Sequence, residues 1–174
     1  MKNNEKNLNM NNNLLLIIVA IVVVFLSFIL MNLKNTPTPP AEPIHVGTLE
    51  KGKSLIIPTA EISNDASFYS VEVEGVVMEV IAVKDSKGEI RTAFNTCQVC
   101  YDSGRGYYVQ DGEQLVCQNC GNRFTMDQVE IETGGCNPWP ISDKNKLIKD
   151  NNIEITYDFL VHSQDIFSHW RNNL

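Results

Sequence analysis

The sequence has little of what several common functions require. It contains 3 histidines, and its 14 Lys or Arg stand against 21 Asp or Glu, which gives a formal net charge of −7. Nucleic-acid binding is disfavoured because it needs a basic face to hold phosphates. No His-rich or Met-rich tract is present, which disfavours copper handling. No Ser/His/Asp arrangement, phosphate-binding glycine loop or catalytic carboxylate pair stands out, so hydrolase and nucleotide-binding functions are disfavoured as well.

The first positive feature is a long apolar run near the N-terminus. Residues 14–31 read LLLIIVAIVVVFLSFILM, in which Ser27 is the only polar residue. As a helix this run is about 27 Å long, close to the hydrocarbon thickness of a bilayer. A cleaved signal peptide is the alternative, but the run exceeds the usual apolar length of about 7–15 residues and no small-residue cleavage site follows. We therefore predict a retained transmembrane helix.

The flanks of this run predict its orientation. Two lysines precede it and one follows closely, and basic residues favour the cytoplasmic side. The Asn-rich residues 1–13 are predicted to be a disordered cytoplasmic tail, and residues 32–44, with four prolines, an extended linker. The prediction is a single-pass protein of the cell membrane, with a domain at 45–174 outside the cytoplasm. Beyond residue 31 the chain has 12 basic and 20 acidic residues, an ordinary balance for a soluble exported domain.

The exported part reads as short strands separated by turns, without a long helical stripe. Residues 69–73 alternate apolar and polar, and residues 76–83 are rich enough in β-branched side chains for a central strand. Asp111-Gly112 between two short apolar segments predicts a hairpin. Further strands are expected at 89–94, 106–109, 114–116, 122–126 and 153–157. We predict a mainly β fold, a small antiparallel β domain whose two cysteine-bearing hairpin loops are Rieske-like or zinc-ribbon-like.

Two cysteine pairs with matched spacing carry the chemistry. Cys97-Gln-Val-Cys100 and Cys117-Gln-Asn-Cys120 are both C-x-x-C motifs, separated by 16 residues. Each pair places two sulfurs near one metal centre, and two pairs complete a four-sulfur site. Disulfides are usual outside the cytoplasm, but the cysteine count of 5 is odd and this spacing is short for a structural bridge. We predict that these four cysteines bind a metal ion or an iron–sulfur cluster.

A fifth cysteine and several glycines accompany the motifs. Gly121 follows the second pair directly and allows a positive φ with close backbone approach. Cys136 lies in Gly134-Gly135-Cys136-Asn137-Pro138, a tight loop of a kind that approaches a buried site closely. Three interpretations of its thiol stay open: an inert buried group, an additional metal ligand, or a redox-active thiol beside the centre. Aromatic side chains expected to shield the centre from water are Tyr107, Tyr108 and Trp139.

The second motif with its surroundings, Val116-Cys-Gln-Asn-Cys-Gly-Asn-Arg-Phe-Thr125, resembles the second half of a Rieske-type domain. In that fold two loops at hairpin tips hold a [2Fe–2S] cluster, and a proline-bearing loop covers it. The histidine ligands of the Rieske pattern are absent here, so this resemblance implies architecture alone. A cluster held by cysteines only implies a lower reduction potential than a His-ligated one.

A second resemblance covers residues 54–141. It is carried by Ile57-Pro58-Thr-Ala-Glu-Ile62, Gly88-Glu-Ile-Arg-Thr-Ala-Phe94, the two C-x-x-C motifs and Gly134-Gly-Cys-Asn-Pro138. Together these segments resemble the FtrD-like membrane iron–sulfur protein family, which is bacterial and has members associated with iron uptake. The resemblance implies a metal centre on an extracytoplasmic domain that passes electrons in metal import, with a permease or a redox protein as partner.

Three functions fit this cysteine pattern. The first is an anchored redox carrier with an iron–sulfur cluster or iron. The second is a binding module in which the same sulfurs hold Zn²⁺ as a structural staple, which a small β domain needs. The third, a dithiol oxidoreductase, is disfavoured because a thioredoxin-like C-x-x-C lies where a strand enters a helix. We predict a redox carrier or metal-binding accessory rather than a catalyst.

Overall fold

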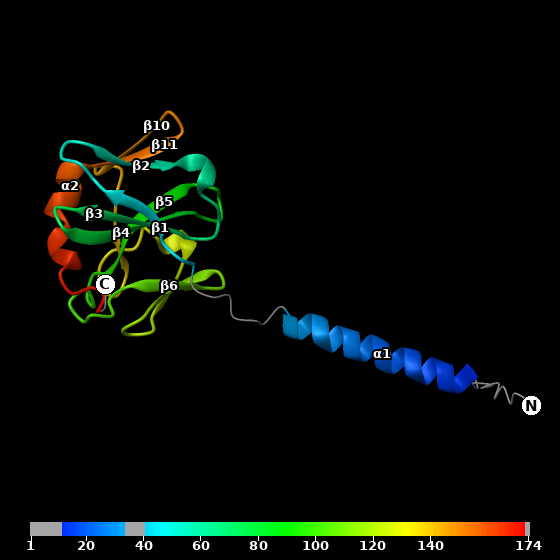
Figure 1. The fold of residues 1–174 in the computed structure, drawn as a ribbon. Coiled ribbons are helices and arrows are strands. Elements are labelled where there is room, and N and C mark those ends of the chain that lie inside the picture. The colour runs from blue at the N-terminus through cyan, green and yellow to red at the C-terminus, as the bar shows by residue number, and fades with distance from the viewer. Residues whose placement is uncertain (1–11, 34–40, 173–174) are drawn as a thin grey trace, which may run out of the picture. The chain divides into compact units, whose positions relative to one another are not determined.

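The structure is a computed structural model that describes residues 12–33 and 41–172. The chain divides into two compact units, one with the helix α1 (Asn12–Leu33) and the other with all the strands (Figure 1). The predicted tail, apart from residues 12 and 13, and positions 34–40 of the predicted linker lie outside the described ranges. The domain boundaries expected from the sequence therefore stay predictions.

The helix α1 forms where the apolar run predicts one. Its side chains from Leu14 to Leu30 are exposed, and the hydroxyl of Ser27 donates a hydrogen bond of 2.6 Å to the Val23 carbonyl oxygen. Among the described residues, no helix has the length and apolar character that crossing a membrane requires. The predicted membrane span is thus unconfirmed.

The strand-bearing unit contains three small sheets. The largest has the order β1-β3-β4-β5-β9. Its strands are β1 (Ile44–Thr48), β3 (Ser67–Val73), β4 (Val76–Lys84), β5 (Ile90–Cys97) and β9 (Pro138–Pro140). Its pairs are antiparallel except for β1, which runs parallel to β3. The prediction of a mainly β fold with small antiparallel sheets is confirmed, with this one parallel pair as a difference.

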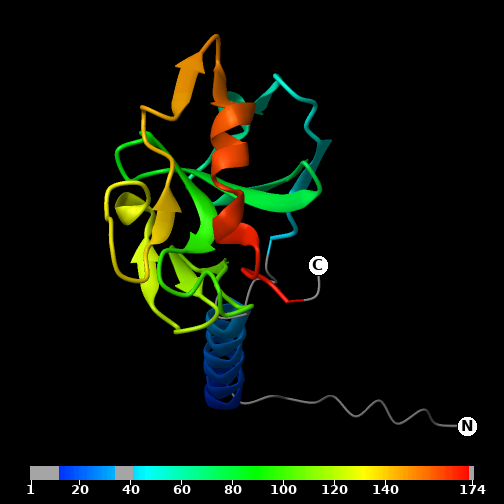
Figure 2. The same cartoon turned by 90° about the vertical axis from the view of Figure 1, so that its left-hand side faces the viewer.

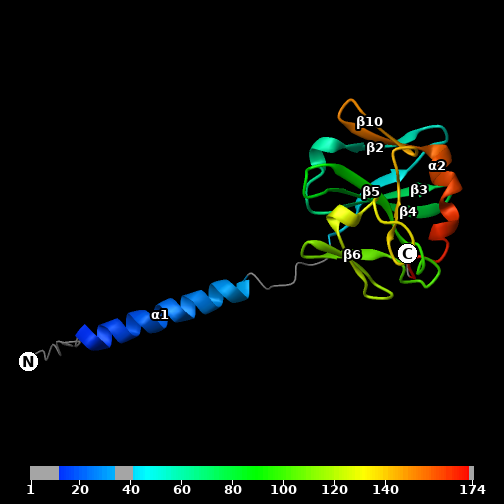
Figure 3. The ribbon, with the colours of Figure 1, turned by 180° about the vertical axis from the view of Figure 1, so that it is seen from behind.

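Two antiparallel three-stranded sheets flank the large one, as Figure 3 shows from behind. One consists of β10 (Lys146–Lys149), β11 (Asn152–Thr156) and β2 (Ser54–Pro58). The other consists of β6 (Tyr108–Asp111), β7 (Gln114–Cys117) and β8 (Arg123–Thr125). The short helical elements are η1 (Thr59–Glu61), η2 (Met126–Gln128), α2 (Tyr157–His162) and η3 (Gln164–Phe167).

The central strands of the large sheet are buried on both faces, whereas the edge strand β1 is exposed. On β4, Val80 and Ala82 belong to a first core shared with β2, β11 and α2, whereas Ile81 and Val83 belong to a second core shared with β6 and β7. Because neither face meets water, β4 is apolar almost throughout rather than alternating. Figure 2 shows α2 and the following η3 turn, in orange and red, along one side of the sheets. The second core contains Cys97, Cys100 and Cys117, and Cys136 packs against it.

Candidate metal centre

Three separate segments bring the five cysteines together. Cys97 ends β5 and Cys117 ends β7, and the second cysteine of each pair lies in the turn that follows. Cys136 lies just before β9, which pairs with β5 so that Pro138 is the register partner of Cys97. Strand pairing, rather than proximity along the chain, therefore positions the thiols.

The sulfurs form two overlapping groups of three, within each of which all Sγ atoms lie within 4.8 Å of one another. The inner group consists of Cys97, Cys100 and Cys117, which are all buried. The outer group consists of Cys100, exposed Cys120 and partly exposed Cys136. All five thiols are free, and the Sγ atoms of Cys100 and Cys136 are 4.0 Å apart. The four predicted ligands are divided between the two groups, and their role in metal binding stays a prediction.

The donor set fits a thiophilic metal. A tetrahedral ion with metal–sulfur bonds of about 2.3 Å places its sulfurs about 3.8 Å apart. The separations within each group are at most 4.8 Å, so only a small closing movement separates these thiols from a metal-binding geometry. Because three loops carry the sulfurs, a bound metal would also hold those loops together.

Hydrogen bonds make Cys97 the most acidic thiol of the inner group. The Cys117 thiol donates to Cys97 and lowers the pKa of Cys97 to about 4, against the opposing effect of burial. The backbone N–H of Cys100, 3.3 Å from Cys97 Sγ, adds to this lowering. The pKa of Cys117 is raised because its thiol donates this bond and is buried. The lowered pKa favours the thiolate of Cys97, the form that binds metals.

In the outer group, too, one thiol has a lowered pKa and the others have raised ones. Burial raises the pKa of Cys100, and burial together with a hydrogen bond to Cys120 raises the pKa of Cys136 to about 12. Burial also disfavours the charged form of Cys120, but the backbone N–H of Asn122 and the Cys136 thiol outweigh it and lower the Cys120 pKa. Each group thus contains one thiol whose pKa is lowered.

The loop that carries Cys136 is fastened to the first C-x-x-C turn by Gln98. The backbone N–H of Gln98 donates to Asn137 O at 3.1 Å, and its Nε2 donates to Pro138 O at 3.2 Å. Its Oε1 accepts from the backbone N–H of Gly134 at 3.0 Å. The Tyr108 hydroxyl donates to the Cys136 carbonyl oxygen. This role of Gln98 is not predictable from the sequence, since a single glutamine within C-x-x-C carries no signal of its distant partners.

The predicted shaping residues lie where their conformations matter. Gly121 has φ +75°, and Gly134 and Gly135 have φ +83° and +65°, a region that other residues rarely adopt. Of the three aromatic residues expected to shield the centre, Tyr108 lies in the second core with the thiols. Tyr107 and Trp139 instead pack against the first core.

A buried polar network lies behind Tyr108 and was not foreseen from the sequence. The backbone N–H of Tyr108 donates to Asn95 Oδ1 at 2.7 Å, and Asn95 Nδ2 donates to Glu79 Oε2 at 2.5 Å. The Arg171 guanidinium lies 3.4 Å from Glu79 Oε1 and 4.3 Å from the centre of the Tyr107 ring. Burial raises the pKa of Glu79, with Asn95 and Arg171 opposing. This network fixes the start of β6 beside the thiol core.

Comparison with curated proteins gave no match, and neither did comparison with solved structures. A family model does match, over residues 48–167, a range that contains all five cysteines. Its description is "Membrane iron-sulfur containing protein FtrD-like". The resemblance found in the sequence motifs is therefore confirmed, and the chain belongs to the FtrD-like family of membrane iron–sulfur containing proteins.

Proposed function

We propose that this protein is a redox carrier of iron uptake, with an iron–sulfur cluster or iron bound by Cys97, Cys100, Cys117 and Cys120. The observation that carries the proposal is the convergence of free thiols from separate loops into groups within 4.8 Å. The family description supports iron–sulfur chemistry. A permease or a redox protein is the proposed partner.

The residues around such a centre have different roles. A bound cluster or iron ion supplies a one-electron redox couple. The buried sulfurs of Cys97 and Cys117 hold its inner side away from water, and the N–H groups of the C-x-x-C turns stabilise the charge on the thiolates. Exposed Cys120 forms the side at which a redox partner approaches most closely.

We also propose that α1 holds the protein at the cell membrane as a single-pass anchor. In this arrangement residues 1–13 lie in the cytoplasm, 14–31 span the bilayer, 32–44 form a linker and 45–174 lie outside the cytoplasm. The family description and the exposed apolar side chains of α1 support the proposal. Alkaline carbonate should leave the full chain in the membrane fraction, whereas release by carbonate would contradict a spanning anchor.

Structural Zn²⁺ binding is the second candidate, and the short sulfur separations favour it because they suit a single tetrahedral ion. The full chain, purified anaerobically in detergent, separates the two functions by metal and sulfide analysis and by absorption. An iron–sulfur protein is brown and is bleached by dithionite, whereas stoichiometric zinc in a colourless protein would overturn the redox proposal. Cys117→Ser and Cys120→Ser should both lose metal and become sensitive to proteases.

A dithiol oxidoreductase is less consistent with the structure. Both C-x-x-C pairs lie in the described part of the chain, and neither is followed by a helix: a turn follows Cys100, and the strand β8 begins three residues after Cys120. A helix N-terminus is what lowers the pKa of the attacking thiol in thioredoxin-like sites. In the purified protein, ligated sulfurs should resist thiol reagents until the metal is removed, whereas a working dithiol would react at once.

A further inference from the structure

We propose that the outer thiols, Cys100, Cys120 and Cys136, form a second metal position that shares the Cys100 sulfur with the inner one. Cys100 is the one member common to the two groups of sulfurs found among the described residues. A closed tetrahedral thiolate site uses four sulfurs, so the five that converge here exceed the need of a single ion. Two neighbouring ions joined by a bridging thiolate use all five.

Several hydrogen bonds hold the loop of Cys136 beside the turn that carries Cys100. Gln98, which stands between Cys97 and Cys100, bonds to the Cys136 loop at three points. Asn137 Nδ2 donates to Gly134 O within the loop, at 2.5 Å, and the Tyr108 hydroxyl donates to the carbonyl oxygen of Cys136 itself. The backbone that carries the thiol is therefore held in place, and the Cys136 Sγ lies 4.0 Å from that of Cys100.

The two positions differ in access to solvent. The inner thiols are at most 7 % exposed, whereas Cys120 is exposed and Cys136 partly so. Each ion has three protein sulfurs, but only on the outer group can water or an incoming ligand reach the remaining coordination position from solvent. An open position of this kind belongs to sites that exchange or react. The outer position thus takes a thiophilic cation that can leave, with the thiol protons released as the metal–sulfur bonds form.

The inference rests on the proposed function in one respect, that the inner thiols bind metal. When both positions are filled, Cys120 belongs to the outer ion rather than to the inner centre. The test uses the full chain in detergent, stripped of metal under anaerobic conditions and titrated with Cd²⁺ alone. The wild type should bind two cadmium ions per chain, and cadmium NMR should show two resonances with scalar coupling through the shared sulfur. Cys136→Ser should bind one ion without coupling, and Thr133→Ser, an exposed change in the same loop, should still bind two.

The outcomes separate the inference from the function on which it rests. One ion per chain in both the wild type and Cys136→Ser would overturn the second position and leave the proposed centre intact. Two ions without coupling in the wild type would overturn the bridge, and this measurement does not depend on the folding of any variant. No cadmium in the wild type would overturn both the inference and the proposed function.

Discussion

Gln98 and Gly134, which are 36 positions apart in the sequence, are joined by a hydrogen bond of 3.0 Å from the glycine N–H to the glutamine Oε1. The same side chain donates from Nε2 to Pro138 O. One of the two non-cysteine residues of the first C-x-x-C turn therefore sets the position of the loop that carries the fifth thiol. In the second C-x-x-C turn, the equivalent Gln118 side chain bonds within its own segment, to Val116 O.

The first prediction follows from this difference. Gln98→Ala removes two hydrogen bonds from the Cys136 loop. One of them leaves the carbonyl oxygen of buried Pro138 without its partner, which costs about 1–3 kcal/mol. The loop should open more often, and in metal-free protein Cys136 should be alkylated at least about tenfold faster, the factor that about 1.4 kcal/mol provides. Peptide mass spectrometry after timed alkylation measures the rate. Gln118→Ala is the matched control, and equal rates in the two variants would contradict the prediction.

The second prediction concerns Gly106. A Cβ at this position would lie 2.3 Å from the Cys100 carbonyl oxygen and 2.7 Å from its carbon, both of which belong to the backbone. The clash can be relieved only by moving the first C-x-x-C turn. Overpacking lowers the free energy of unfolding by about 1–3 kcal/mol. We expect Gly106→Ala to reach the upper end of this range because the backbone must shift.

The control for Gly106 is Gly112, which has φ +61° and no atom near the position of a Cβ. Gly112→Ala carries only the strain of a left-handed backbone, about 1–2 kcal/mol. Urea unfolding of the metal-free chains measures both changes, and metal content should fall in Gly106→Ala alone. The steric argument would fail if both variants kept full metal content.

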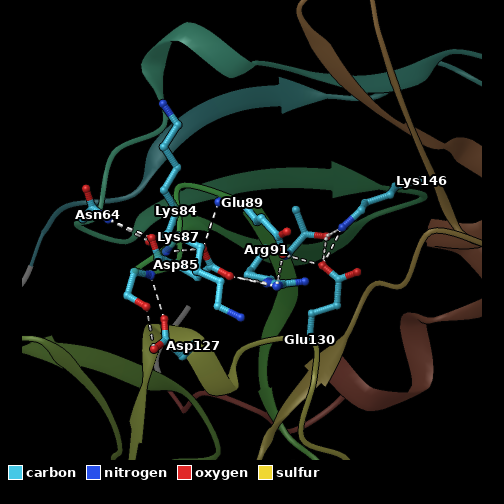
Figure 4. Close-up of polar contacts among 11 residues, drawn as sticks. Asn64, Lys84, Asp85, Lys87, Glu89, Arg91, Asp127, Glu130 and Lys146 are labelled. Carbon is cyan, nitrogen blue, oxygen red and sulfur yellow. Dashed lines mark hydrogen bonds and ion pairs between the residues drawn. The ribbon is translucent and has the colours of Figure 1, made fainter.

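The third prediction concerns the buried ion pair of Lys146 and Glu130. Lys146 Nζ lies 2.5 Å from Glu130 Oε2 and 3.0 Å from Thr92 Oγ1, and the Lys146 side chain is 1 % exposed (Figure 4). Lys146→Met leaves the Glu130 carboxylate buried without its cation, which costs about 3–5 kcal/mol in the free energy of unfolding. Replacing both members, Lys146→Met with Glu130→Gln, should recover part of the loss.

A lysine of the same strand provides the comparison. The Lys149 side chain is 63 % exposed and lies 3.8 Å from the Asp150 carboxylate. Exposed pairs contribute about 0–1 kcal/mol, so Lys149→Met should leave the unfolding midpoint almost unchanged. If the two lysine variants lost equal stability, the buried pair would have no special role.

The sequence predicts local strands better than it predicts their partners. Residues 76–83 and 114–116 form strands as expected, because β-branched runs and the Asp111-Gly112 turn act locally. The strands β9 and β10 were not predicted, since three or four residues with proline or lysine form a strand only when a neighbour pairs with them. The predicted strand 153–157 loses its last residue to α2, where Thr156 caps the helix by accepting from the Phe159 N–H.

For the candidate site too, local sequence signals were predictive and contacts between distant segments were not. The spacing of the C-x-x-C motifs was enough to identify the candidate ligands, and the glycines around Cys136 indicated a loop that approaches them. The grouping of Cys120 with Cys136 was not predictable, because it depends on the pairing of β9 with β5. The role of Asn95 was equally hidden, since an isolated polar residue in a strand gives no sign of a buried partner such as Glu79.

The last prediction concerns the dependence of stability on pH. Glu79 is 3 % exposed, and burial raises its pKa, with the Asn95 hydrogen bond and the charges of Arg171 and His45 opposing. A raised carboxyl pKa means that the folded protein binds this proton more tightly than the unfolded chain does. The stabilisation is therefore complete below the ordinary pKa of 4.5 and is lost as the pH rises through the raised value.

Glu79→Gln removes this titration. Above pH 4.5 the free energy of unfolding of the wild type should fall with rising pH relative to that of the variant, until the pH exceeds the raised pKa. Urea unfolding of both chains at a series of pH values measures the difference. Glu113→Gln, which replaces an exposed carboxylate, should track the wild type. A wild-type curve parallel to that of Glu79→Gln would show that Glu79 carries the same charge in the folded and unfolded chains.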